Sequence, residues 1–445
     1  MNEQAFGFVD LFAGIGGFHH ALEAQGGSCV LAVERDLDCQ QVYRHTFPDT
    51  PLVHDIRSLT QNDRGDDRDL TEVGELVPDH DVLCAGFPCQ PFSKSGFQKG
   101  VRDRSRGTLF YDVMTIVMAK RPRFVLLENV RNLAGPRHLD TWNGIIDSLQ
   151  AQGYQVARDP LVLSPHLLSP SDGGAPQVRD RVFILAYRPE SAVFDVNARP
   201  LLDRQLSLGW NPDDWQIEDY LDDDKDISDL EQYQLGEDES AWVAAWQAFV
   251  ETIAADHLPG FPIWVDAFTE EPHVPPDTPK WKSGFLVKNS EFYVEHREVI
   301  DDWINRKWSN GQSVTDFPPS RRKFEWQARR AQPTRGDRDL GKLVLQMRPS
   351  GIRVKPPTYL PALVAITQTS VVGSRMRRIT PCEAARLQGM PSDLFALAGV
   401  RDSVAYKQLG NAVNVGVVSA AARALFSAGK APWLATTVQE LQATG

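Results

Sequence analysis

The sequence is short of cysteine, of long apolar runs and of positive charge, and each shortage excludes a class of protein. It has 5 cysteines in 445 residues, at positions 29, 39, 84, 89 and 382, and no CxxC pair. Thiols this few and this scattered exclude a disulfide scaffold, argue against structural zinc and favour a reducing compartment. No run of about 20 apolar residues is present, so we predict no membrane span. The opening MNEQAFGF lacks the basic segment that begins a signal peptide, and we expect a cytoplasmic protein.

The formal net charge is -12 at pH 7, which alone speaks against a nucleic-acid partner because a binding surface must neutralise phosphates. The charge is unevenly distributed, however. Residues 211–240 contain 13 acidic side chains and one basic one, Lys225, which predicts a solvated or partly disordered insertion. Residues 321–355 contain eleven Lys or Arg against three acids, which is typical of a nucleic-acid face, with an ordinary solvated surface as the open alternative. The candidate contacts there are Arg321, Arg322, Lys323, Arg348 and Arg353.

The length suggests two domains, or one large domain with an insertion. In the first 190 residues, short apolar runs alternate with helical patterns. The apolar runs predict buried strands at Phe8–Phe12, Cys29–Glu34, Asp81–Ala85, Phe124–Glu128 and Val182–Tyr187. The patterns between them predict helices at Phe18–Gln25, Asp38–Phe47, Leu109–Met118 and Thr141–Gln150. This alternation indicates an α/β fold whose mostly parallel sheet is covered on both faces.

Seven of the eleven tryptophans lie between positions 242 and 326, and we interpret most of them as the core of a second domain and not as base-stacking platforms. Amphipathic helices with these rings on the apolar face are predicted at Ser240–Ala254 and Ser290–Trp308. Near the end, Val404–Leu425 is interpreted as a strand or turn followed by an Ala- and Val-rich helix. Its composition is closer to that of the first domain than to that of the second.

The stretch FVDLFAGIGGF, Phe8 to Phe18, is an apolar run that leads into a Gly-rich turn and a helix. Glycines let a ligand approach the backbone closely, and a helix N-terminus offers free N–H groups. Glu34 follows 20 residues after Gly14, at the end of the next predicted strand, where an acid can bind ribose hydroxyls. Asp55 and Ile56 would follow a third strand and meet an adenine ring. The pattern indicates an adenosine-type cofactor, although an ordinary strand–turn–helix junction shares the Gly-rich turn.

The stretch GFPCQPFSKSG, Gly86 to Gly96, sets Cys89 just beyond a predicted strand, at the sheet edge where ligands bind in such folds. A thiolate there is a strong nucleophile. The polar, basic and Gly-containing sequence that follows suits a loop that closes on a substrate. An inert thiol is the alternative, and it suits the other four cysteines well.

Two further motifs carry polar side chains at strand ends. LLENV, Leu126 to Val130, ends an apolar strand with Glu128, whose carboxyl group can hydrogen-bond or protonate a ring nitrogen. In QVRDRVFILAY, Gln177, Arg179 and Arg181 alternate and therefore share one face of a strand. Two guanidinium groups on one face fit a phosphate or a polarised carbonyl. A capping acid and a salt-bridged edge strand are the structural alternatives.

These motifs, in this order, resemble those of the cytosine-C5 DNA methyltransferases. RRITPCEAARLQGMP, Arg377 to Pro391, and KQLGNAVNVGVV, Lys407 to Val418, resemble the last two motifs of that family. The resemblance covers about residues 1–190 and 345–425. It implies a Rossmann-like methyltransferase domain with a mostly parallel sheet and a smaller inserted target-recognition domain. The expected boundaries are 1–190 for the catalytic and cofactor-binding domain, 191–400 for target recognition, 401–430 for a segment that returns to the catalytic domain, and 431–445 for a tail.

The resemblance also implies the chemistry. Cys89 would attack C6 of a flipped cytosine in duplex DNA, Glu128 would contact N3 and the exocyclic amine, Arg179 would hold O2, and Arg181 would position Glu128. S-adenosyl-L-methionine would give up its methyl group to C5 and leave as S-adenosyl-L-homocysteine. The implied cofactor residues are Phe12, Gly14, Gly16, Gly17, Glu34, Asp55, Ile56, Pro88, Leu109, Asn411 and Ala412. In the loop after Cys89 the implied DNA contacts are Gln90, Ser93 and Ser95, and no metal is expected.

The expected partner is double-stranded DNA, with residues 211–240 facing away from it. The family suggests a monomer of bacterial or phage origin, associated with the nucleoid, and a cognate restriction endonuclease that would act separately. One departure from the family is Cys382, which stands where the residue is usually basic. A tRNA cytosine-C5 methyltransferase is disfavoured because the inserted segment is long and the sequence has no CFT. A non-catalytic relative is disfavoured because the cysteine and cofactor residues are present, and a nicotinamide oxidoreductase because the turn is GxGG.

Overall fold

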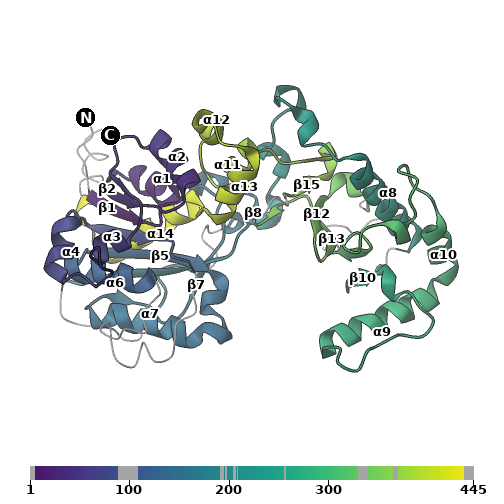
Figure 1. Ribbon diagram of the computed structural model, residues 1–445, viewed down its shortest axis with the longest axis horizontal. Coiled ribbons are helices and arrows are strands. Elements are labelled where there is room, and N and C mark those ends of the chain that lie inside the picture. Colours follow the sequence, from purple (N-terminus) through teal and green to yellow (C-terminus); the bar gives the residue numbers. More distant parts are fainter. Residues whose placement is uncertain are drawn as a thin grey trace. The chain divides into compact units, whose positions relative to one another are not determined.

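The computed structural model describes residues 6–88, 109–190, 195, 198–203, 207, 209–254, 257–328, 338–363 and 369–434 (Figure 1). The chain forms two compact units. Unit 1 comprises Met1–Trp215, Ala362–Ala365 and Ala384–Gly445, and unit 2 comprises Gln216–Pro361 and Ile366–Glu383. Unit 2 thus begins at residue 216 rather than at the expected 191, and residues 384–400 belong to unit 1 rather than to the inserted segment.

Unit 1 is built on an eight-stranded sheet with the order β3-β2-β1-β4-β5-β9-β6, in which β7 also pairs with β9. The pairs from β3 to β5 are parallel, and β9 runs antiparallel to β5, β6 and β7. The fold is therefore α/β with a largely parallel sheet, as predicted. The strands of unit 1 are β1 (Phe6–Leu11), β2 (Gly27–Val33), β3 (Leu52–Val53), β4 (Val82–Ala85), β5 (Phe124–Val130), β6 (Gln155–Val156), β7 (Leu161–Leu163), β8 (Gln177–Val178) and β9 (Arg181–Tyr187).

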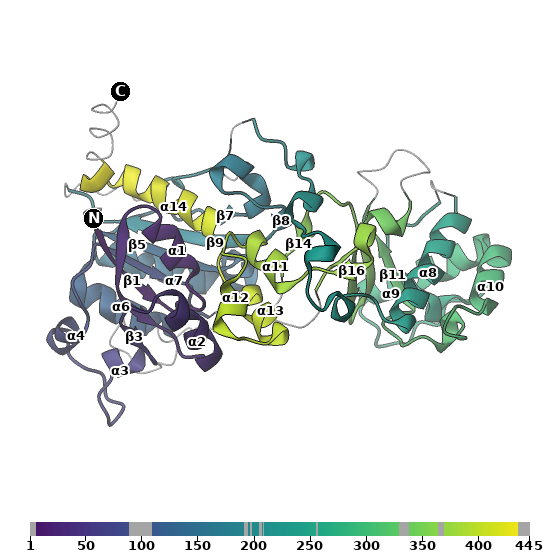
Figure 2. The ribbon, with the colours of Figure 1, turned by 90° about the horizontal axis from the view of Figure 1, so that it is seen from above.

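Helices cover both faces of this sheet, because its central strands are apolar on both sides. On one face, Phe8 of β1 and Phe124 of β5 belong to the same core as Phe426 of α14. On the other face, Val125 of β5 packs with residues of α4, α6 and α7, and Figure 2 shows α14 and α7 on opposite sides of the strands. The helices of unit 1 are α1 (Gly17–Glu23), α2 (Leu37–Thr46), α3 (Arg57–Thr60), α4 (Leu70–Leu76), α6 (Leu109–Lys120), α7 (Leu139–Ala151), α12 (Leu394–Ala398), α13 (Asp402–Asn411) and α14 (Val415–Ala428). Helix α11 (Pro381–Leu387) crosses the boundary between the units.

The C-terminal segment of unit 1 is helical throughout most of its length. The predicted strand or turn at the start of Val404–Leu425 is instead α13, and only the helix that follows, α14, agrees with the sequence pattern. Asp402–Ala428 is the stretch of the described residues that is long and apolar enough to cross a membrane. Its most apolar window is 72% buried inside the protein, which is typical of a core helix.

Unit 2 has a six-stranded sheet with the order β10-β11-β13-β12-β15-β16, one face of which packs against helices. The strands of unit 2 are β10 (Ile263–Trp264), β11 (Lys323–Trp326), β12 (Val344–Arg348), β13 (Gly351–Lys355), β14 (Leu360–Pro361), β15 (Val371–Val372) and β16 (Arg377–Arg378). Of these, β14 lies outside the six-stranded sheet. Its helices are α8 (Glu237–Thr252), α9 (Lys280–Glu295) and α10 (Arg297–Asn305). The prediction of one helix at Ser290–Trp308 is wrong, because α9 begins earlier and the chain bends at His296 before α10. Four of the seven tryptophans between 242 and 326 are buried in this unit, as expected: Trp246, Trp303, Trp308 and Trp326.

The acidic residues 211–240 are ordered, so the expectation of a solvated or partly disordered insertion is wrong about disorder but right about solvation, since most of these side chains are exposed or half-buried. They form short 3-10 turns, Pro212–Asp214, Ile217–Tyr220, Asp224–Asp226 and Leu230–Gln232. In unit 2 their carboxylates pair with arginines that lie about 150 positions later in the sequence. Asp224 lies 2.8 Å from Arg377, which is fully buried and also ion-paired with Glu383 at 2.8 Å. The negative charge of this segment therefore helps to hold unit 2 together.

Candidate active site

The Gly-rich turn between β1 and α1 has left-handed backbone at Phe12, Gly14 and Gly16, with φ values of 61°, 57° and 89°. A Cβ atom on Gly14 would meet nothing within 4 Å, so this position faces open space. A Cβ on Gly16 would lie 2.3 Å from the Phe47 ring, and one on Gly17 would lie 2.6 Å from Val413. Packing alone therefore accounts for the glycines at positions 16 and 17, whereas Gly14 leaves room for a ligand.

Glu34 follows β2 and is held in place by the turn. Its carboxylate accepts hydrogen bonds from the backbone N–H of Gly14 at 2.8 Å and of Asp36 at 2.6 Å. Each oxygen keeps a lone pair that can accept a further donor, such as a ribose hydroxyl. The acid and the Gly-rich turn, which the sequence linked by their spacing, therefore touch each other.

Asp55 and Ile56 follow β3, as the sequence predicted. Asp55 is half-buried, and its carboxylate accepts a hydrogen bond from the backbone N–H of Arg57 at 3.0 Å. Ile56 is only 2% exposed and belongs to the apolar core on the sheet face that α4, α6 and α7 cover. Leu109, another predicted cofactor residue, begins α6 and is half-buried. The carboxyl ends of β1, β2 and β3 thus place the Gly-rich turn, Glu34 and Asp55 with Ile56 on one edge of unit 1.

A buried polar cluster under the Gly-rich turn was missed by the sequence analysis. Asp10 of β1 is fully buried and faces the Cys84 thiol of β4, and burial raises the pKa of Asp10 well above its usual range. Next to it, the His19 ring lies 2.7 Å from the Tyr43 hydroxyl, and burial lowers the pKa of His19 to about 3. Asp10 was hidden because it stands in an otherwise apolar run, and a lone acid in such a run is the signal that could have revealed it.

The root of the nucleophile loop is described up to Pro88, which is exposed, while Cys89, Gln90, Ser93 and Ser95 lie outside the described residues. Gly86 and Phe87 follow β4 directly. The Asn129 side-chain amide donates a hydrogen bond to the Phe87 carbonyl at 2.7 Å. This bond ties the beginning of the loop to the end of β5, so the two motifs GFPCQ and ENV start from neighbouring points on the sheet edge.

Glu128, at the end of β5, is 8% exposed and lies 3.1 Å from the Arg181 guanidinium of β9. A Cβ on Gly86 would lie 3.5 Å from its carboxylate, so the acid borders the loop root. Burial raises the pKa of Glu128, and the positive charges of Arg181 and Arg179 oppose that rise. The protonated form, which can donate a hydrogen bond to a ring nitrogen, therefore persists to a higher pH than in a free glutamate.

Arg179 is 1% exposed, and its guanidinium donates to the backbone carbonyls of Leu363 at 3.0 Å, Gly410 at 2.9 Å and Ala412 at 2.5 Å. Arg179, which was expected to hold the base, therefore also links the segment between β8 and β9 to the turn between α13 and α14 through hydrogen bonds. Its Nε atom has no hydrogen-bond partner among the described residues.

The turn between α13 and α14 closes against the Gly-rich turn. Asn411 is exposed, Ala412 is buried, and Val413 packs against Gly17. Asn414, which the sequence analysis did not single out, accepts a hydrogen bond from the Val417 N–H at 3.0 Å and donates one to the Leu387 carbonyl at 3.0 Å. The last motif of the sequence thus reaches the first one across the fold.

Most of the predicted DNA-binding cations in unit 2 are already partnered. Arg322 lies 2.8 Å from Asp266, and Arg353 makes two bonds, of 2.9 and 2.7 Å, to Glu325. Arg321 donates to the Arg348 carbonyl at 2.9 Å and lies over the Trp242 ring. Lys323 and Arg348 form no ion pair within the described part of the chain, so they keep their charge available for phosphate.

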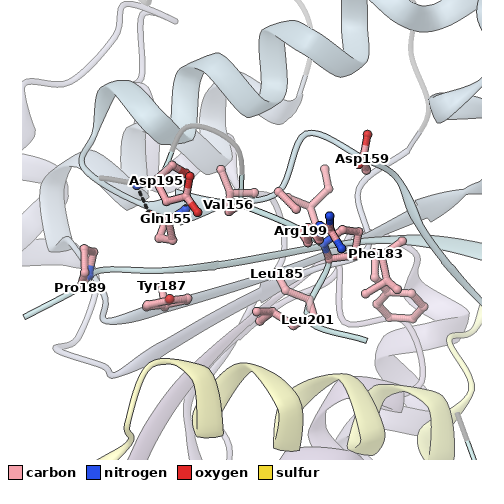
Figure 3. Close-up of a pocket in the computed structure, with 15 residues that line it drawn as sticks. Gln155, Val156, Asp159, Phe183, Leu185, Tyr187, Pro189, Asp195, Arg199 and Leu201 are labelled. Carbon is pink, nitrogen blue, oxygen red and sulfur yellow. Dashed lines mark hydrogen bonds between the residues drawn. The ribbon is translucent and has the colours of Figure 1, made fainter. Parts of the chain in front are cut away.

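Two other features involve none of the predicted site residues. A cavity of about 420 Å³ opens beside β6, β7 and β9, between Phe183, Tyr187 and Arg199, and it is lined by none of the predicted cofactor or catalytic residues (Figure 3). In unit 2, His257, Glu295 and His296 place possible metal-ligand atoms within 4.8 Å of one another.

Comparison with known proteins agrees with this geometry. The family model of C-5 cytosine-specific DNA methylases matches residues 6–427. The chain is 39% identical to the type II methyltransferase M.AluI of Cellulosimicrobium cellulans, over 93% of this chain and 90% of the relative. It is 40% identical to M.HhaI of Haemophilus parahaemolyticus, over 41% of this chain and 49% of that one. The solved structure of S. pombe Dnmt2 methyltransferase shares the fold, with a TM-score of 0.50, 15% identity and coverage of 95% of this chain and 98% of that chain. The chain therefore belongs to the C-5 cytosine-specific DNA methylase family.

Proposed function

We propose that this enzyme transfers a methyl group from S-adenosylmethionine to C5 of a flipped-out cytosine in a specific duplex DNA sequence, through a covalent bond between Cys89 and C6. The observation that carries the proposal is the junction of the two catalytic motifs. The Asn129 amide holds the Phe87 carbonyl at 2.7 Å, two residues before Cys89, while Glu128 precedes Asn129 in the same strand. Because Cys89 follows this anchor by two residues, its thiol and the Glu128 carboxyl group can act on the same base.

The residues at the Gly-rich edge fit the cofactor. Open space over Gly14 admits its amino-acid portion, the fixed Glu34 carboxylate can accept the two ribose hydroxyls, and Asp55 with Ile56 can flank the adenine. Phe12, Pro88, Leu109, Asn411 and Ala412 would complete the walls, whereas Gly16 and Gly17 would act through packing. When bound there, the cofactor supplies an electrophilic methyl group.

The side chains of this chain would carry the other steps. The Cys89 thiolate adds to C6, and the protonated Glu128 carboxyl donates to N3, so the negative charge that develops on the ring is neutralised. C5 becomes nucleophilic and takes the methyl group. A base then removes the C5 proton, and the electron pair of that bond re-forms the C5–C6 double bond and expels the thiolate. N3 returns its proton to Glu128, which restores the aromatic ring, and Cys89 is free again. Arg181 keeps Glu128 in place, and the Nε–H of Arg179 can bind O2 of the cytosine.

The target base must leave the duplex before Cys89 can reach it, at a cost of a few kcal/mol that DNA contacts must offset. Ser95 of the loop would fill the space it leaves, and Gln90 and Ser93 would contact the DNA. Lys323 and Arg348, which form no ion pair within the described residues, would bind phosphates, with Arg321, Arg322 and Arg353 held by their own partners. We further propose that the enzyme acts as a monomer and that a cognate restriction endonuclease would act separately.

Nucleoside mass spectrometry tests this proposal. Purified enzyme and S-adenosylmethionine are incubated with mixed-sequence duplex DNA or with tRNA, in parallel with the Cys89→Ala variant. We expect 5-methylcytosine in the DNA from the native enzyme only, and bisulfite sequencing of that DNA then gives the target site. Methylation confined to tRNA, or methylation by the alanine variant, would contradict the proposal.

A further inference from the structure

Unit 2 contains an aromatic pocket with no residue that we assign to catalysis or to the cofactor. Its volume is about 300 Å³, and it lies between strands β10, β11 and β13 and the N-terminal half of α9. Three rings border it. The Trp264 and Phe285 rings meet edge to face with centroids 5.5 Å apart, and the Trp281 and Phe285 rings do so at 6.2 Å. Helix α9 runs beside β10 in Figure 1.

The rings of this pocket are unusually open to solvent. Trp281 is 64% exposed, although most tryptophans of unit 2 are buried. Phe285 and Trp264 are only half-buried, and the buried positions of α9 begin at Asn289. Exposed aromatic rings gathered around a hollow are typical of a surface that binds a ligand.

Charged groups on the same walls indicate which ligand. Lys323 extends its ammonium group to 5.9 Å from the Trp264 ring and has no carboxylate partner among the described residues. Arg353 donates two hydrogen bonds to one carboxylate oxygen of Glu325 in the wall, and the two side chains are 25% and 28% exposed. The pair can both donate hydrogen bonds to a base edge and accept them from it. A nucleobase can stack on exposed aromatic rings while its phosphate binds a neighbouring cation, and this pocket offers both.

We infer that this pocket, formed by Trp264, Trp281, Phe285, Lys323, Glu325 and Arg353, binds one unstacked nucleobase of a DNA strand. The base would stack on the tryptophan and phenylalanine rings, its phosphate would lie against Lys323, and the Glu325–Arg353 pair would meet its edge. A volume near 300 Å³ is at the small end of ligand sites and suits a single base. The inference rests on the proposed function in that DNA is the substrate, and it adds a second base-binding site in the other unit.

Binding of single-stranded DNA tests the inference apart from methyl transfer. A fluorescent oligonucleotide of A, G and T, without cytosine, is titrated by anisotropy against the full-length enzyme and its Trp281→Ala variant. The exposed Trp281 can be removed without opening a core. The matched control is Val294→Ala, which changes a 54% exposed side chain on the same helix but outside the pocket. Because stacking on one ring accounts for most of the affinity per base, Trp281→Ala should weaken binding by roughly 5- to 150-fold, and the control should match the native enzyme.

The salt dependence of binding gives a second readout. Lys323→Gln should lower the slope of log Kd against log salt by about 0.7, the value for one phosphate contact on a single strand. The inference is overturned if the native enzyme does not bind the oligonucleotide, or if Trp281→Ala binds as tightly as Val294→Ala. Methylation of duplex DNA by the same native preparation separates this failure from failure of the proposed function, since an enzyme that methylates without these effects refutes the pocket alone.

Discussion

Replacement of Glu128 by glutamine is the substitution that most sharply separates catalysis from structure. The carboxyl group is 8% exposed and lies 3.1 Å from Arg181, and a glutamine amide oxygen can still accept that bond with nearly the same shape. What is lost is the proton that the burial of Glu128 favours. Positioned proton donors contribute about 10²- to 10⁴-fold to rates, and the amide N–H can still bind N3, so we expect kcat to fall by roughly 100-fold.

The assay is transfer of a labelled methyl group to duplex DNA, with the DNA affinity measured separately. The Kd for DNA should change little, because Glu128 would act on the base after it has entered the site. The matched control is Glu190→Gln, which neutralises a 72% exposed side chain paired with Arg123 in the same unit. A kcat for Glu128→Gln within a few-fold of the control would refute the role that we assign to this carboxyl group.

The pH dependence of stability gives an independent check on Glu128. Its pKa in the folded protein is raised above the unfolded value of about 4.3, so its protonated form stabilises the fold below that pH. This stabilisation is lost as the pH rises through the folded pKa. Glutamine does not titrate, so the melting temperature of Glu128→Gln relative to the native enzyme should rise over the same range. A pH-independent difference would contradict the raised pKa.

Three further substitutions test the packing on which the site rests. Asp10→Asn should cost less than about 1 kcal/mol near neutral pH, because burial already favours the neutral acid, and an unfolding free energy lowered by several kcal/mol in urea would show that the charged form is needed. Gly17→Ala places a Cβ 2.6 Å from Val413 and should destabilise the enzyme by about 1–3 kcal/mol, so an unchanged urea midpoint would disprove the close approach. Glu383→Ala leaves the fully buried Arg377 without its main partner and should cost about 3–5 kcal/mol in the same measurement, whereas a neutral result would mean that Asp224 suffices.

The parts of the fold that could be predicted from sequence are those set by local pattern. Strands such as Val82–Ala85 and Phe124–Val130 are buried on both faces, so they stand out as continuous apolar runs. Glu34 was found because the spacing from the Gly-rich turn to the next strand end is local too. Helix α10 was merged with α9 because the apolar period continues from Phe292 through Trp303 across the bend at His296.

The parts that could not be predicted depend on partners far away in the chain. Residues 211–240 looked like a disordered acidic insertion because Arg375, Arg377 and Arg378, which neutralise Glu218, Asp224 and Glu239, come about 140–160 positions later. Arg179 was read as a base contact, and nothing local signals that its guanidinium also binds carbonyls at 363, 410 and 412. The exposure of Trp281 could not be predicted either, because a tryptophan is expected in the core from its residue type alone.

The most direct measurement of the central claim is capture of the covalent intermediate. Duplex DNA is made with 5-fluorocytosine in place of every cytosine, so the proton that must leave C5 is replaced by fluorine and the thiolate cannot be eliminated. After incubation with enzyme and S-adenosylmethionine, denaturing electrophoresis and peptide mass spectrometry are used to find the adduct. The account predicts a complex that survives denaturation, with the modified base on Cys89, and no such complex with Cys89→Ala. A native enzyme that methylates ordinary DNA but forms no adduct, or forms it at another residue, would contradict the account.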